Sequence, residues 1–264
     1  MNKIVRDVEI AFDDEGSGPS LVFLHGYPFN RSMWREQVEE LAQRHRVIVP
    51  DLRGHGKSAV TPGVVTMEEM AGDVAALLES LQVSRATIAG LSMGGYVALA
   101  FYRLFPLQVR SLILADTRAQ GDTEEGKKNR EQHAEKALRE GMEGIADALL
   151  PKLLTPETVA KRPNIVKRVR EMIVGADPEG AAAALRGMAR RLDHTSLLSR
   201  IIAPTLILVG REDALTPVAD SELMHREIGG SRIQVVEGAG HVSNIEKPEK
   251  FNAAITEFLS DLEV

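Results

Sequence analysis

Short apolar runs alternate with amphipathic stretches along most of this chain. The apolar runs are bounded by Gly, Pro and Asp, which is typical of strands, while apolar residues recur at helical spacing in the stretches between them. The pattern predicts strands over residues 4–12, 20–24, 46–50, 86–90, 109–115, 204–209 and 232–237. It predicts helices over residues 32–44, 66–82, 93–105, 217–227 and 247–262. Strands that alternate with helices form a mostly parallel sheet flanked by helices, so the expected fold class is α/β.

Local signals mark the start of two of these helices. Ser32 is the expected N-cap of the first helix. Thr66 precedes the second helix and is followed three positions later by Glu69, which is the spacing of a capping box. The first two strands are expected to be separated by a turn over residues 16–19, whose sequence is Gly-Ser-Gly-Pro.

Residues 117–200 interrupt the alternation. This stretch has a helical pattern, holds 16 of the 32 Lys and Arg residues and contains no Phe, Tyr or Trp. We therefore expect a helical cap at 117–200, inserted into an α/β core formed by residues 1–116 and 201–264. Most of the charged residues of this cap are expected to lie on solvated helix faces, and most of its apolar residues are expected to form the core of the cap. The apolar residues expected to line a substrate pocket are Met142, Leu150, Leu154 and, from the core, Val242.

Charge and composition limit the kinds of partner, location and cofactor that are expected for this protein. The net charge of −6 does not favour binding to nucleic acid or to an anionic membrane surface. No apolar stretch approaches the roughly 20 residues of a membrane span, and the first residues lack an apolar signal core, so a cytoplasmic location is expected. The chain has no Cys, which excludes disulfides and thiolate ligands, and it has no dinucleotide or metal-binding motif. No cofactor and no metal are expected, and the sequence does not decide between a monomer and a dimer.

One pentapeptide carries the clearest chemistry. Gly90, Ser92 and Gly94 form a Gly-x-Ser-x-Gly motif placed between a predicted strand and a predicted helix. A serine on such a sharp strand-to-helix turn presents its hydroxyl away from the backbone, as a nucleophile does. The motif and its context therefore predict that Ser92 attacks a substrate.

A serine hydroxyl needs a base, and the base needs an acid. His241 follows the strand 232–237 on a glycine-rich loop, and Asp213 follows the strand 204–209. Loops at the carboxyl ends of parallel strands gather at one edge of the sheet, and the order Ser, Asp, His is the one expected for this arrangement. Asp116, at the end of the strand 109–115, remains an alternative acid.

Acyl transfer also needs donors for the negative charge of a tetrahedral intermediate. The backbone N–H of Met93 directly follows the nucleophile and opens a helix. The second donor is expected from the loop after the strand 20–24, where Tyr27 N–H is the candidate because Pro28 has no N–H. His25, beside this turn, is expected to be structural.

Together these motifs resemble the α/β-hydrolase superfamily along essentially the whole chain. The motifs that carry the resemblance are His25-Gly-Tyr-Pro28, Asp51-Leu-Arg-Gly-His-Gly-Lys-Ser58, Gly90-Leu-Ser-Met-Gly94, Asp213 and His241. Within the superfamily the chain is similar to capped bacterial carboxylesterases of the group often named 3-oxoadipate enol-lactonases. The resemblance implies an α/β-hydrolase fold, a triad of Ser92, Asp213 and His241, and an oxyanion hole made by the Tyr27 and Met93 amides.

The expected function is hydrolysis of small to medium acyl esters through an acyl-enzyme. The alternative is a lactonase for a substrate that bears a carboxylate, which needs a cation in the pocket, and Arg118 and Arg191 are the candidates. Perhydrolysis and carbon–carbon bond hydrolysis remain further alternatives within the superfamily. A receptor-like, non-catalytic hydrolase fold belongs to a different class, and the complete triad argues against it.

Overall fold

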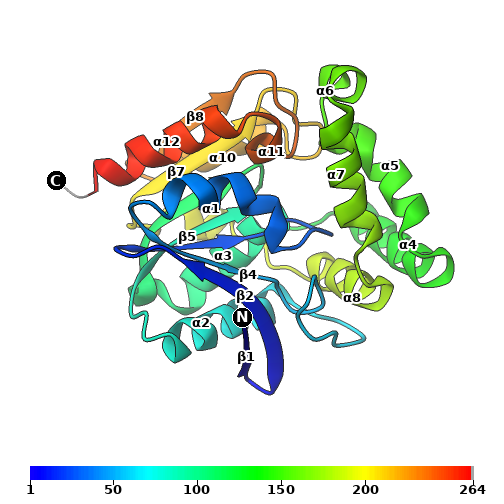
Figure 1. Cartoon of the computed structure of the whole chain (residues 1–264), viewed down its shortest axis with the longest axis horizontal. Coiled ribbons are helices and arrows are strands. Elements are labelled where there is room, and N and C mark those ends of the chain that lie inside the picture. Colours follow the sequence, from blue (N-terminus) through cyan, green and yellow to red (C-terminus); the bar gives the residue numbers. More distant parts are fainter. Residues whose placement is uncertain (263–264) are drawn as a thin grey trace.

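The computed structural model describes residues 1–262, and a single eight-stranded sheet forms its centre (Figure 1). The strand order is β1-β2-β4-β3-β5-β6-β7-β8. The β1–β2 and β2–β4 pairs are antiparallel, and the other neighbours are parallel. The strands are β1 (Asn2–Val5), β2 (Val8–Glu15), β3 (Ser20–Leu24), β4 (Arg46–Pro50), β5 (Ala86–Leu91), β6 (Val109–Ala115), β7 (Thr205–Gly210) and β8 (Arg232–Val236). The expected mostly parallel α/β sheet is confirmed.

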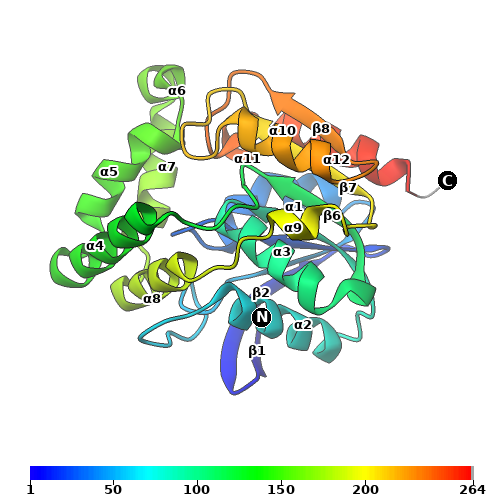
Figure 2. The same ribbon diagram turned by 180° about the vertical axis from the view of Figure 1, so that it is seen from behind.

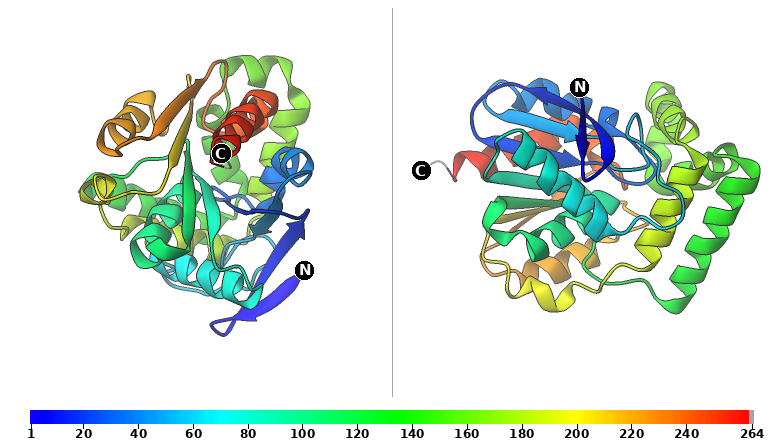
Figure 3. Two further views of the ribbon diagram at one scale, coloured as in Figure 1. Left: turned by 90° about the vertical axis from the view of Figure 1, so that its left-hand side faces the viewer. Right: turned by 90° about the horizontal axis from the view of Figure 1, so that it is seen from below.

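Helices cover both faces of this sheet, and the alternation of side chains along the strands divides the core in two. On β3, Val22 and Leu24 belong to one apolar cluster, whereas Leu21 and Phe23 belong to the other. The first cluster is completed by α2 (Met67–Ser80), α3 (Met93–Leu104) and α10 (Val218–Glu227), and the second by α1 (Arg35–Leu41) and α12 (Pro248–Ser260). Figure 3 (left) shows α1 and α12 on the side of the sheet opposite to α3 and α10.

Several elements differ from their predictions at turns that the sequence pattern does not mark. The predicted strand 4–12 is a hairpin of β1 and β2, because Arg6 and Asp7 both adopt positive φ angles, of 49° and 63°. The predicted helix 32–44 is shorter than expected. It consists of a 3₁₀ turn (Arg31–Trp34) followed by α1, and its N-cap is Asn30 rather than Ser32.

The other predicted helices and strands are present, with ends displaced by a few residues. The capping box of α2 is formed as expected, since Thr66 Oγ1 accepts from the Glu69 N–H and the Glu69 carboxylate accepts from the Thr66 N–H. None of the helices described in residues 1–262 combines the length and the apolar character that crossing a bilayer requires.

Between β6 and β7 the chain forms a separate group of helices. They are α4 (Glu124–Glu140), α5 (Glu143–Leu153), α6 (Pro156–Lys161), α7 (Pro163–Val174), α8 (Pro178–Ala189) and α9 (Thr195–Leu198). The first five, which we call the cap, stand beside the sheet at one end of the molecule (Figures 1 and 2), while α9 packs against α10 of the core. The cap rests on the loop between β4 and α2, where Val65 N–H donates to Ala183 O of α8 at 3.1 Å.

Candidate active site

Ser92 sits on a strained turn between β5 and α3. Its backbone angles are φ 54° and ψ −114°, in a region that L-residues seldom occupy. The turn is so tight that a Cβ on Gly90 would lie 2.1 Å from the carbonyl oxygen of Gly94, so only glycine fits there. The Thr117 hydroxyl donates to Ser92 O at 2.8 Å and ties the turn to the end of β6. This geometry lifts the serine side chain off the backbone toward the cap.

The structure brings Ser92, His241 and Asp213 into one hydrogen-bonded chain. His241 Nε2 lies 2.8 Å from Ser92 Oγ, and His241 Nδ1 lies 2.8 and 2.9 Å from the two carboxylate oxygens of Asp213. An ionised carboxylate can only accept, so the proton of the neutral imidazole sits on Nδ1 and Nε2 is left free to accept the serine proton. The arrangement can therefore remove a proton from Ser92.

The carboxylate of Asp213 is held by its own loop. It accepts hydrogen bonds from the N–H groups of Leu215 and Thr216 at 2.8 and 2.9 Å, and from the Thr216 hydroxyl at 2.7 Å. Thr216 is not among the residues expected at the site. The Asp-x-x-Thr spacing marks it, because an Asp side chain readily accepts from N–H groups two and three residues further on.

Charge within this group shifts the two pKa values in opposite directions. Burial alone would raise the pKa of Asp213, but the adjacent His241 and the hydrogen bonds from Thr216 lower it below its usual value. Burial alone would lower the pKa of His241, but the charge of Asp213 and its hydrogen bond outweigh burial and raise it. The pair therefore stabilises an imidazolium, which a general base becomes when it takes a proton.

Asp116, the alternative acid, lies nearby but bonds to other groups. It is fully buried and accepts from the Gly210 N–H at 2.7 Å and from the Ser243 hydroxyl at 2.5 Å. Burial, and next the negative charge of Asp213, raise its pKa to about 8. Within residues 1–262 the carboxylate that hydrogen-bonds His241 is that of Asp213, which favours Asp213 over Asp116 as the acid.

The two candidate oxyanion donors lie beside the nucleophile. Met93 follows Ser92 at the first position of α3, and a Cβ added to Gly26 would lie 3.5 Å from Ser92 Cβ, so the loop of Tyr27 contacts the same turn. Within the described residues, neither the Tyr27 N–H nor the Met93 N–H donates to a protein acceptor. Both are free to bind a substrate oxygen.

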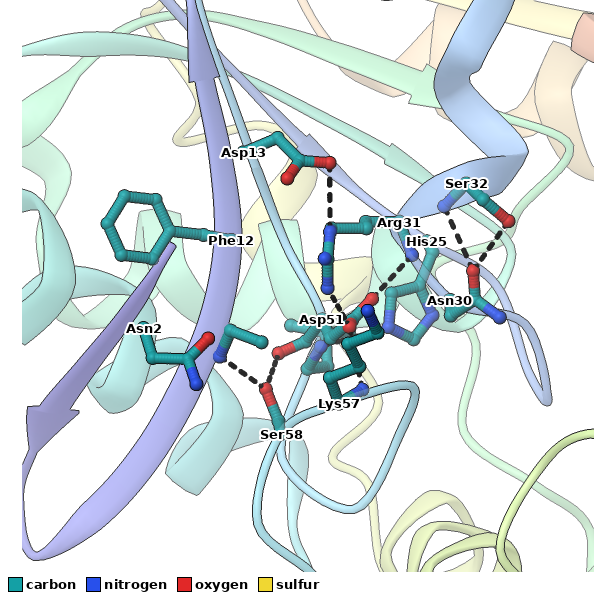
Figure 4. A network of polar contacts seen from close by, with 12 residues as sticks. Asn2, Phe12, Asp13, His25, Asn30, Arg31, Ser32, Asp51, Lys57 and Ser58 are labelled. Atoms are coloured by element: carbon teal, nitrogen blue, oxygen red, sulfur yellow. Dashed lines mark hydrogen bonds and ion pairs between the residues drawn. The ribbon is translucent and has the colours of Figure 1, made fainter.

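The motif at residues 51–58 supports this loop (Figure 4). The buried Asp51 carboxylate accepts from the Arg31 N–H at 2.7 Å and the Lys57 N–H at 2.8 Å, and it pairs with the Arg31 guanidinium. His25 Nε2 accepts from the Leu52 N–H at 2.9 Å. The expected structural role of His25 has a geometric basis here, because its ring joins the loop of Tyr27 to the loop of Asp51.

Two histidines in this region predict loss of stability in acid. Burial lowers the pKa of His25 to about 4 and that of His55 to about 3. From pH ~6.5 down to these values the unfolded chain binds more protons, so the free energy of unfolding falls by about 1.4 kcal/mol per pH unit for each histidine. Urea unfolding at pH 7, 6 and 5 measures this slope.

One variant assigns part of the slope to His55. His55→Gln is expected to reduce the dependence of stability on pH, because it removes one of the two buried imidazoles. Equal slopes in His55→Gln and in the unmodified protein would contradict the assignment.

A cavity of about 350 Å³ opens above Ser92 and His241. On α5 its lining residues are Ile145, Ala148, Leu149, Lys152 and Leu153, which form one helical stripe. The four residues expected to line the pocket, Met142, Leu150, Leu154 and Val242, are not among those that do. The helix α5 spans Glu143–Leu153, so Met142 and Leu154 lie just outside its ends, and Leu150 lies off the stripe that faces the cavity.

The cavity carries an excess of positive charge. Arg118, Arg130 and Lys152 line it, and Asp122 is the acidic side chain among the lining residues. Burial, and then the charges of Lys152, Lys136 and Arg130, lower the pKa of His133, which lines the same wall.

Of the two cations considered for a lactone carboxylate, only Arg118 reaches the cavity. Arg191 is buried over the Tyr96 ring, 4.2 Å from its centroid, and pairs with Asp122 at 2.6 Å. Arg191 is therefore a structural cation rather than a ligand for substrate.

The sequence of this chain is similar to those of known hydrolases. It matches the alpha/beta hydrolase family over residues 21–254. It is 32% identical to 3-oxoadipate enol-lactonase 2 of Acinetobacter baylyi over 252 aligned residues. The alignment covers 95% of this chain and 92% of that protein. The chain therefore belongs to the alpha/beta hydrolase family and is a hydrolase, which confirms the resemblance drawn from its motifs.

Solved structures agree with this family. A thermophilic esterase from Thermogutta terrifontis, described with malate bound, superimposes with a TM-score of 0.97 at 44% identity, covering 100% of this chain and 99% of that one. The enol-lactonase from Burkholderia xenovorans LB400 superimposes with a TM-score of 0.93 at 30% identity, covering 98% of this chain and 100% of that one. The fold is that of the alpha/beta hydrolases, and esterases and lactonases are both among the similar proteins.

Proposed function

We propose that this hydrolase is a carboxylesterase that acts through Ser92, His241 and Asp213. The observation that carries the proposal is the continuous hydrogen-bonded chain from Ser92 Oγ through the imidazole to Asp213, with its serine end open to the cavity. A serine in this position needs only an ester carbonyl beside it to begin acyl transfer.

The reaction follows from the positions of these atoms. Ser92 Oγ attacks the carbonyl carbon while His241 Nε2 takes the hydroxyl proton, and the Tyr27 and Met93 amides bind the resulting oxyanion. His241 then gives the proton to the departing alkoxide, which leaves an acyl-Ser92 ester. Water enters, loses a proton to His241 and attacks the acyl carbon. His241 then returns this proton to Ser92 Oγ as the acyl–oxygen bond breaks, so the carboxylic acid is released and Ser92 is regenerated.

The size of the cavity favours small and medium acyl groups. A volume of about 350 Å³ lies near the lower end of the range for small-molecule sites. The test is hydrolysis of nitrophenyl esters from acetate to laurate. We expect kcat/KM to be highest for the short and medium chains and to fall toward laurate. Failure to turn over any ester in the series would sink the proposal.

The positive charge of the cavity supports a second function, hydrolysis of a lactone or ester that bears a carboxylate. Arg118 is the cation of most interest, because it lines the cavity and lies close enough to His241 for its charge to offset part of the rise in the pKa of that ring that Asp213 causes. Its Nε is buried without a hydrogen-bond partner among the described residues, and its one ion pair, with Asp122, is long at 3.5 Å. A substrate carboxylate offers this guanidinium a better acceptor.

Arg118→Gln tests the anionic substrate. For an ester whose acyl chain ends in a carboxylate, kcat/KM is expected to fall roughly 10- to 100-fold, the equivalent of one charged hydrogen bond. The methyl-capped, neutral analogue is expected to change far less, so the ratio of the two kcat/KM values is the measurement. Lys152→Gln, an exposed cation on the same cavity wall, serves as the comparison variant. An unchanged ratio in Arg118→Gln would rule Arg118 out as the carboxylate ligand.

A further inference from the structure

Glu246 is a buried carboxylate that joins two segments far apart in the chain. It ends the short helix α11 (Ser243–Glu246) and is 1% exposed. Its Oε2 accepts from the Gly240 N–H at 2.6 Å, while its Oε1 accepts from the N–H and the hydroxyl of Thr155, each at 3.0 Å. The hydrogen-bond partners of the carboxylate are thus two backbone N–H groups and a hydroxyl. Burying a carboxylate is costly. We therefore ask what these contacts hold in place, and they join two segments of the chain.

One side of this contact belongs to the cap. Residues 153–162, which we call the cap junction, run from the end of α5 to the start of α7. Within it Thr155 is the N-cap of α6, since its hydroxyl accepts from the Thr158 N–H at 3.1 Å. Leu153 lines the cavity above Ser92. The cap junction therefore forms part of the cavity wall.

The other side carries the candidate base. Residues 240–246, the base segment, hold His241 directly after Gly240. Besides the Glu246 contacts, the His241 N–H donates to Leu153 O at 2.9 Å, and the Arg162 guanidinium donates to Glu246 O. The bonds made by Thr155, Leu153 and Arg162 run between the base segment and the cap junction, and Figures 1 and 2 show α6 and α11 at the same end of the sheet.

The consequence for His241 is one of position. The backbone before it, residues 238–240, reads Gly-Ala-Gly, which leaves little side-chain packing to hold the ring. A base must stay within hydrogen-bond reach of its nucleophile, and a displacement of about 1 Å can cost roughly 100-fold in rate. The bonds at Gly240 N–H and His241 N–H, with the bond from the Glu212 N–H to Ala239 O at 2.9 Å, hold the main chain that carries the ring.

We propose that Glu246 is a positioning residue: it ties the cap junction to the base segment and so sets where His241 stands relative to Ser92. The inference rests on the proposed function, because it takes His241 as the base. Glu246 is not among the residues that line the cavity, so it acts through the main chain and not on substrate. It follows that the cap is fixed to the core at this end. A change in the position of the cap on the core therefore changes the alignment of His241 with Ser92.

Glu246→Gln is the first test. The amide keeps the shape of the side chain, but one of its two ends is now a donor, which faces either the Gly240 N–H or the Thr155 N–H. Thr155→Val is the second variant, since it removes one cap-side donor and leaves the bond to Gly240 intact. Asp14→Asn is the matched control, because Asp14 binds the Arg46 guanidinium through both of its oxygens, on residues outside the cap junction and the base segment.

The measurement is the second-order rate constant for phosphonylation of Ser92 by a fluorophosphonate. In this reaction the serine oxygen bonds to phosphorus, fluoride leaves and His241 takes the proton, so the rate reports the alignment of the base without needing the natural substrate. Thermal unfolding of each variant is recorded in parallel, with rates measured well below the transition. Where an ester is turned over, kcat and KM are determined as well.

We expect Glu246→Gln to slow labelling roughly 10- to 100-fold and Thr155→Val to slow it less, in the same direction. Asp14→Asn is expected to lower the unfolding temperature with no change in rate. The kinetic loss in Glu246→Gln should fall on kcat more than on KM.

Wild-type labelling in folded Glu246→Gln would overturn the inference, and wild-type labelling in Thr155→Val would remove the link to the cap. If Glu246→Gln does not fold, Thr155→Val decides. If the wild-type protein is labelled at Ser92 but hydrolyses no ester or lactone, the proposed function is wrong. The comparison of labelling rates between the variants still tests the role of Glu246 in that case.

Discussion

Replacing Ser92 with Ala is expected to lower kcat/KM by about 10⁴- to 10⁶-fold, the range seen when a nucleophile that works with its base and acid as a unit is removed. The reason is chemical rather than structural, because alanine lacks the oxygen that forms the acyl bond but fits the same turn. Binding of a product carboxylate should persist, since the cations of the cavity are untouched. Steady-state hydrolysis of the best nitrophenyl ester measures the effect.

The control for this prediction is an exposed serine away from the cavity. Ser260 lies at the end of α12, and Ser260→Ala is expected to keep the full rate. Ser92→Ala should also unfold at a temperature close to that of the unmodified protein. Retention of more than a few per cent of the hydrolysis rate in pure Ser92→Ala would mean that another group attacks the ester.

The second large effect is expected at the acid. Asp213→Asn is expected to lower kcat by about 10⁴-fold, because an amide cannot hold the imidazole in the tautomer whose Nε2 accepts the serine proton. Asp116→Asn is expected to lose less than about tenfold. Burial and the charge of Asp213 raise the pKa of Asp116 to about 8, so it is largely neutral at pH 7, and asparagine reproduces that form.

The two variants together identify the acid. Both side chains lie at strand ends near His241, and each substitution removes one carboxylate while keeping its size. A large loss in Asp116→Asn with near-normal rates in Asp213→Asn would make Asp116 the acid. Equal large losses would mean that the two carboxyl groups act as one coupled pair.

The strand-to-helix alternation made most of the fold predictable. Each parallel strand is a short apolar run with Gly, Pro or Asp at its ends, and such runs have few other places to go than a buried sheet. Because functional loops of such a sheet gather at the carboxyl ends of its strands, Ser92, Asp213 and His241 could be named as one group from sequence. The structure places His241 within hydrogen-bond distance of both Ser92 and Asp213.

What could not be predicted depends on helix phase and on contacts between distant residues. The cavity wall is decided by where α5 begins, and a shift of one residue turns a side chain by about 100°. This is why Leu149 and Leu153 line the cavity where Leu150 and Leu154 were expected. The bond between Glu246 and Thr155 spans 91 residues, and no local pattern marks either partner. The Arg6–Asp7 turn was missed because it lacks the glycine that usually signals such a turn.

The central claim is that Ser92 carries the acyl group during hydrolysis, and a rapid-quench experiment tests it most directly. The protein is mixed with a nitrophenyl ester, quenched in acid within milliseconds, digested and examined by mass spectrometry. If Ser92 is the nucleophile, we expect a burst of nitrophenol close to one equivalent per active site, with the acyl mass on the peptide that contains Ser92 and no burst in Ser92→Ala. Two results would contradict the claim that Ser92 carries the acyl group. One is steady hydrolysis with the acyl mass on another residue. The other is slow deacylation with no acyl mass on any peptide.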